Sequence, residues 1–93
     1  MSPQTHAEIT RATQAFIDTL VDAQALAAAG EFGPRLAELL ARARRLLDIV
    51  DERMLGLDRD KYADAFVVAQ TMRTGLDRLS EAATTDAGDA VAD

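Results

Sequence analysis

Apolar side chains recur at alternating gaps of four and three residues between positions 36 and 57, and this spacing limits the fold more than any other feature. Such a repeat places all its members on one side of an α-helix, which then buries that side against other helices. The sequence therefore predicts a helix over residues 34–55, whose buried seam consists of Leu36, Leu40, Ala43, Leu47, Val50, Met54 and Leu57, widened by Leu39 and Leu46.

Two other segments show helical spacing, and no segment alternates with the period of two that a half-buried strand requires. We expect a helix over residues 5–29 and another over residues 58–83. The apolar positions of the first are Ile9, Ala12, Phe16, Leu20, Ala23 and Ala27. Those of the second are Tyr62, Phe66, Ala69, Met72, Leu76, Leu79 and Ala83.

Residues with known preferences for helix ends mark the boundaries. Thr5 and Glu8 match the capping box, in which each side chain accepts a hydrogen bond from the other residue's backbone N–H. Gly30 suits the left-handed position after a helix, and Pro34 suits the first position of the next one. Asp58 is expected to cap the third helix.

These elements predict an all-α, antiparallel, up-down-up three-helix bundle of one domain over residues 5–83. The 93-residue chain is too short for two stable cores, and loops of two to four residues make neighbouring helices antiparallel. Residues 1–4 are expected to be a flexible N-terminus, and residues 84–93 a frayed, disordered acidic tail. Gly75 lies inside the third helix and marks either a close helix crossing or a tolerated glycine.

Composition argues against several functional classes. There is no cysteine and one histidine, so neither a metal site nor a catalytic thiol is expected, and no cofactor is implied. The net charge of −6 argues against nucleic acid as a partner. No apolar run approaches the ~20 residues of a membrane span, and no leader is apparent, so we expect no membrane association and a cytoplasmic location.

A partner-binding surface is expected on two helix flanks that the seams do not use. Ile17, Val21 and Ala28 lie beside the apolar stripe of the first helix, and Ile49 lies outside the seam of the second. Arg42 and Arg53 share the flank of Ile49, which gives an apolar centre with an arginine rim. The alternative is that both flanks are buried inside the bundle. If they are exposed, a symmetric homodimer is the first arrangement to consider.

Arg73 falls near the line of Phe66 and Ala69, close to the buried side of its helix. Asp77, one turn further on, is the expected neutralising partner. Arg73 is either a residue at the edge of the seam, with its charged end in water, or a contact for a bound anion or carboxylate.

The stretch LAELLARARR (36–45) is similar to the first helix of the small all-α chorismate mutases. This resemblance implies a dimeric three-helix enzyme in which arginines and a lysine bind two carboxylates. The sequence departs from that pattern, because the stretch falls in the second predicted helix and the lysine that should follow it is missing. Lys61 is the only lysine of the chain.

The function that these observations favour is a non-catalytic helical module that binds another protein or a copy of itself. No catalytic constellation is apparent, and the apolar arc is wider than one seam needs. One alternative is an acidic inhibitor, antitoxin or immunity-type protein that neutralises a basic partner. Another is a small structural subunit of a phage or secretion assembly, and a chorismate mutase type enzyme is the least favoured.

Overall fold

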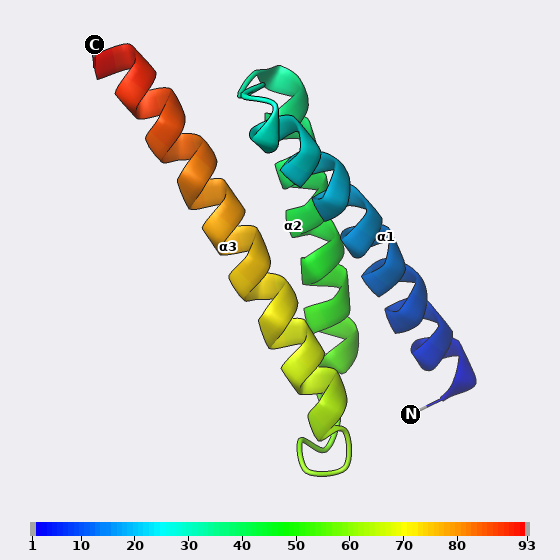
Figure 1. Ribbon diagram of the computed structural model, residues 1–93. Helices are drawn as coiled ribbons and strands as arrows, with labels where there is room; N and C mark the ends of the chain where they lie inside the picture. Colours follow the sequence, from blue (N-terminus) through cyan, green and yellow to red (C-terminus); the bar gives the residue numbers. More distant parts are fainter. Residues whose placement is uncertain (1, 93) are drawn as a thin grey trace.

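The computed structural model describes residues 2–92, with side chains described for residues 2–84. The chain forms three helices, α1 (Pro3–Ala28), α2 (Pro34–Met54) and α3 (Ala63–Ala92), and the described residues contain no strand. Successive helices run in opposite directions, with α2 between α1 and α3 in the view of Figure 1. The predicted all-α, up-down-up three-helix bundle is confirmed.

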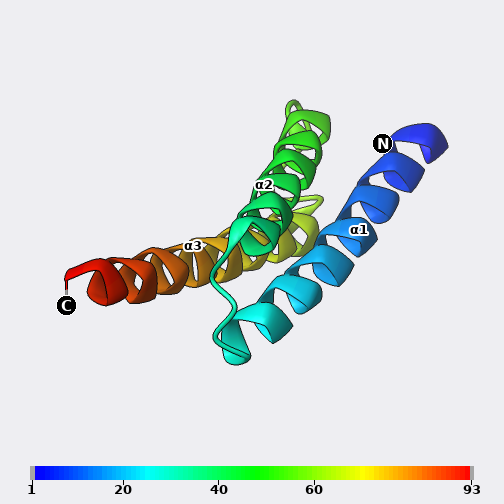
Figure 2. The same cartoon turned by 90° about the horizontal axis from the view of Figure 1, so that it is seen from above.

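The bundle is a close helical hairpin with a third helix packed more loosely on it. α1 packs along α2, whereas α3 makes fewer contacts with α2 and fewest with α1. Figures 1 and 2 both show the C-terminal part of α3 leaving the other two helices. α1 and α3 thus pack the least closely of the three helix pairs in the described part of the chain.

The turn between α1 and α2 follows the chemistry that the sequence indicates. Gly30 has φ +77°, the left-handed conformation that glycine adopts without strain. Its N–H donates to the carbonyl of Ala27 (3.0 Å), and the N–H of Glu31 donates to the carbonyl of Leu26 (2.9 Å). These two bonds form a Schellman motif that ends α1.

The predicted seams form the core. The side chains of Phe16, Val50 and Leu76, one from each helix, are almost completely buried. Thr19 is a buried polar residue, and its hydroxyl donates to the carbonyl of Ala15 (2.8 Å), which satisfies it. The other buried apolar side chains are Ala12, Ala23, Leu36, Ala43, Leu47, Met54, Ala69 and Met72.

The predicted start of the first helix is wrong by two residues. Ser2 is the N-cap residue, and its Oγ accepts a hydrogen bond from the N–H of Thr5 (3.1 Å). Pro3 occupies the first helical position, where its missing N–H costs nothing. Thr5 therefore lies inside α1, and Glu8 is free for the ion pair with Arg53 described below.

The connection between α2 and α3 is longer than expected and covers residues 55–62. Asp58 does accept N–H hydrogen bonds through Oδ1, from Asp60 (2.8 Å) and Lys61 (3.1 Å). These bonds close a turn within the connection. The regular helix begins at Ala63 and not at residue 58.

At its other end, α3 continues as helical backbone to Ala92, beyond the predicted end at residue 83. The side chains of residues 85–93 lie outside the described part of the structure. The disordered acidic tail over residues 84–93 therefore stays a prediction.

Candidate interaction surface

An exposed stripe along α1 carries no carboxylate, ammonium or guanidinium group. Its gaps of three and four residues keep it on one side of the helix, at ~100° per residue. Ile17 and Val21 lie at its centre with 45% and 56% of their surface exposed. The full stripe consists of His6, Thr10, Gln14, Ile17, Val21, Gln24 and Ala28.

The charged residues of α1 lie elsewhere on the helix. Their mean position around the helix axis is about a third of a turn from the centre of the stripe, since each residue advances by ~100°. These charged residues are Glu8, Arg11, Asp18 and Asp22. Asp18 is at the boundary, where its Oδ1 accepts a hydrogen bond from Gln14 (3.0 Å). α1 thus has a buried side, a charged side and an uncharged side that faces solvent.

On α3, three uncharged positions lie between two exposed charged residues of the same helical line, Asp64 and Arg78. Val68, Thr71 and Gly75 follow the same helical spacing, and Val68 is 47% exposed. The hydroxyl of Thr71 donates to the carbonyl of Val67 (3.0 Å), so its single donor is already used within the helix. Leu20 of α1 lies next to Gly75, which shows that the two helices approach each other on this side.

A shallow groove separates α1 from α3 and has a volume of about 280 Å³. Val50 and Met54, buried core residues of α2, also line this groove. Its walls are contributed by α1 and α3, and among them are Ile9, Thr13, Gln14, Ala65, Val68 and Met72. We call the stripe of α1, this groove, and Val68, Thr71 and Gly75 of α3 the uncharged surface.

The structure separates the six residues of the predicted docking face. Ile17, Val21 and Ala28 lie on the uncharged surface. Ile49 instead lines a groove between α1 and α2 together with Ala15. Ile17 follows Ala15 by two residues, which is ~200° around the helix. The stripe that contains Ile17 and the groove that contains Ile49 therefore lie on nearly opposite sides of α1.

The groove between α1 and α2 is bordered by charges. Ile49 is 42% exposed, and both Arg11 and Arg53 lie beside it. The Nε of Arg53 lies 2.8 Å from Oε2 of Glu8, so its guanidinium is already paired within the chain. Arg42 is also exposed and lies about two helical turns before Ile49 on the same side of α2. The arginine rim expected for the docking face thus belongs to a different surface from Ile17 and Val21.

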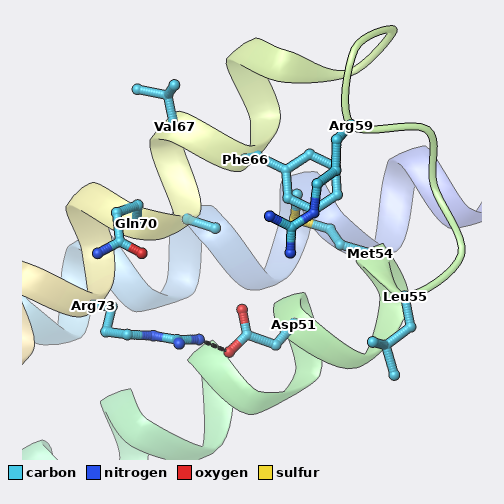
Figure 3. Close-up of a pocket in the computed structure, with 9 residues that line it drawn as sticks. Asp51, Met54, Leu55, Arg59, Phe66, Val67, Gln70 and Arg73 are labelled. Carbon is cyan, nitrogen blue, oxygen red and sulfur yellow. Dashed lines mark hydrogen bonds and ion pairs between the residues drawn. The ribbon is translucent and has the colours of Figure 1, made fainter.

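A pocket of about 550 Å³ lies between α2 and α3 and contains Arg73 (Figure 3). Arg73 pairs with Asp51 of α2, and the predicted partner Asp77 is wrong because Asp51 faces Arg73 across the helix interface. Arg59 lies across the ring of Phe66, 5.2 Å from its centre. The carboxylate that Arg73 contacts is thus part of the same chain.

Val68 is absent from the predicted docking face, although helical spacing on α3 is sufficient to place it outside the seam. Val68 falls outside the seam of α3 yet is a large apolar residue, as Ile17 is on α1. The surface also depends on the sparse packing between α1 and α3, and helical periodicity carries no information about that.

Groups of three or more side chains suited to holding a metal ion do not occur among the described residues. Within that same part of the chain, none of the helices combines the length and the apolar character needed to cross a membrane.

Comparison of the chain with protein families, with characterised proteins and with solved structures finds no match.

Proposed function

We propose that the chain is a non-catalytic helical module that binds another protein or a copy of itself through the uncharged surface. The observation that carries this proposal is the exposure of Ile17 and Val21 on the α1 stripe, whose residues Thr10 and Gln14 line the same apolar groove as the exposed Val68. Scattered exposed apolar residues need no explanation, but a contiguous group with a polar border is typical of binding sites.

The composition of this surface supports protein binding. The centres of protein interfaces are depleted of charge and surrounded by polar residues. Ile17 and Val21 form such a centre, and Thr10, Gln14 and Gln24 form the polar border. The groove between α1 and α2 is less suitable, because Arg11 and Arg53 border its apolar part.

Comparative affinity capture tests the proposal. Tagged wild-type protein is incubated with extract of the organism that encodes it, beside the variants Ile17→Asp and Val68→Asp. Each aspartate would bury an unpaired charge in the interface. Ile49→Asp is the matched control, because Ile49 is equally apolar and similarly exposed on a different surface.

We expect wild type and Ile49→Asp to retain a set of proteins, including untagged copies of the chain. Ile17→Asp and Val68→Asp are expected to lose these proteins. Retention of the same proteins by all four versions would refute the proposal. Circular dichroism of each variant ensures that a loss of binding does not come from a loss of folding.

The net charge of −6 keeps an acidic inhibitor of a basic protein as the second candidate. Salt separates the two, because attraction between opposite charges weakens as ionic strength rises. Binding through the uncharged surface lacks that dependence. Capture that disappears between low and physiological salt, and that Ile17→Asp leaves unchanged, would favour the inhibitor.

A further inference from the structure

We infer that the occupant of the uncharged surface is a second copy of this chain, related to the first by a two-fold axis that passes through the α1 stripe. The inference rests on the proposed function and names the partner. In this dimer the α1 helices of the two copies pack against each other along Ile17 and Val21. Val68 of each copy closes the side of the contact.

Two-fold symmetry explains why this surface lacks charge. In a two-fold interface, residues near the axis face their own counterparts in the other copy. A charged residue there would therefore meet the same charge. Each copy also carries a net charge of −6, so two copies repel each other, and a neutral contact face adds no further like-charge repulsion to this.

The two other hollows lined by exposed apolar side chains fail this requirement. The groove between α1 and α2 is bordered by Glu8, Arg11 and Arg53. The pocket between α2 and α3 contains Arg59 and Arg73. On α1, the stretch of the stripe from Thr10 to Gln24 combines exposed apolar side chains with a complete lack of charge.

The length of α1 and the width of the molecule set an upper limit on the area of this contact. α1 has 26 residues and is therefore ~39 Å long at ~1.5 Å per residue. The molecule measures 52 × 20 × 17 Å, so the side that α1 and α3 share is at most about 20 Å wide. A contact of the full length and width would cover roughly 800 Å² per copy, the size of a standard protein interface, and the charge-free stretch from Thr10 to Gln24 supplies roughly half of that.

The centre of the stripe has the character that a dimer core needs. Val21 is the more exposed of the two central residues, at 56%. β-Branched side chains such as Ile17 and Val21 have few rotamers, so their burial costs little side-chain entropy. The hydrogen bond from Gln14 to Asp18 holds the nearest acid at the border of the contact.

Analytical ultracentrifugation of the full chain provides the first test, over micromolar to millimolar concentrations. The inference predicts that the wild-type mass rises to twice the chain mass of 10.0 kDa. Ile17→Asp and Val21→Asp are expected to remain at the mass of one chain, whereas Ile49→Asp is expected to dimerise as wild type does.

Single cysteines provide a second test that does not depend on tolerance of aspartate. The chain has no cysteine, so Val21→Cys and Ile49→Cys each introduce one reactive thiol. A short bis-maleimide is expected to join two copies of Val21→Cys and to leave Ile49→Cys as single chains. Crosslinking of Ile49→Cys alone would place the contact on the wrong helix face and overturn the inference.

The outcomes also distinguish this inference from the proposed function. A wild-type chain that stays at the mass of one copy at all concentrations overturns the dimer. If Ile17→Asp then still loses captured proteins that Ile49→Asp retains, the proposed function stands with a different partner. If it loses none, both fail.

Discussion

Leu20 of α1 lies over Gly75 of α3 with room for one methyl group between them. A Cβ added to Gly75 would be 3.5 Å from Cδ2 of Leu20, an ordinary van der Waals distance. Gly75 is therefore not required for the approach of the two helices, which decides between the two interpretations of this glycine in favour of a tolerated one.

The first prediction is that Gly75→Ala stabilises the protein. Alanine is favoured over glycine inside a helix by about 1 kcal/mol, mainly because it restricts the unfolded chain. Urea denaturation is expected to show a higher midpoint with an unchanged slope. A lower midpoint would mean that α1 and α3 pack more closely than the structure shows.

The second prediction concerns the seam of α2. Leu47 is 4% exposed, so Leu47→Asp places an unpaired carboxylate in the core and is expected to abolish cooperative folding. Ile49→Asp, two residues further along the same helix, is expected to unfold at nearly the wild-type denaturant concentration because Ile49 is exposed. Helical circular dichroism in a urea titration measures both, and similar destabilisation by the two variants would contradict the assigned burial.

The seams were predictable because they are local properties of each helix. The spacing of Leu36, Leu47 and Met54 predicts which side of α2 is buried, and the structure buries that side. Gly30 is similar, since its left-handed conformation depends on its immediate neighbours.

The errors arose where several local signals competed or where distant elements meet. Ser2-Pro3 and Thr5-Glu8 are both reasonable helix starts, and the structure uses the first. The partner of Arg73 depends on how α3 lies against α2. The preference for pairs one turn apart on a helix predicted Asp77, whereas the partner is Asp51. The splitting of the docking face likewise depends on which sides of α1 its neighbours cover.

The third prediction is that the ion pair between Asp51 and Arg73 contributes little to stability. The two side chains are 37% and 46% exposed, and exposed ion pairs contribute about 0–1 kcal/mol. A double-mutant cycle with Asp51→Asn and Arg73→Gln is expected to give a coupling energy below about 1 kcal/mol. A coupling of several kcal/mol would indicate that this pair holds α3 in place.

The fourth prediction is that salt strengthens self-association. Each copy carries a net charge of −6, and the repulsion between two copies is screened within ~10 Å at 0.1 M salt. Because the proposed contact has no ion pairs to lose, the dissociation constant from sedimentation equilibrium is expected to fall as sodium chloride rises. A dimer that dissociates on addition of salt would instead have a contact formed by opposite charges.

The most direct test of the uncharged surface is a concentration series of amide NMR spectra of the wild-type chain. Resonances of residues 10–24 in α1 and 68–75 in α3 are expected to shift or broaden as concentration rises. Those of residues 42–53 in α2, on the arginine-bordered side, are expected to stay constant. Changes centred on residues 42–53, or none at any concentration, would contradict self-association through the uncharged surface.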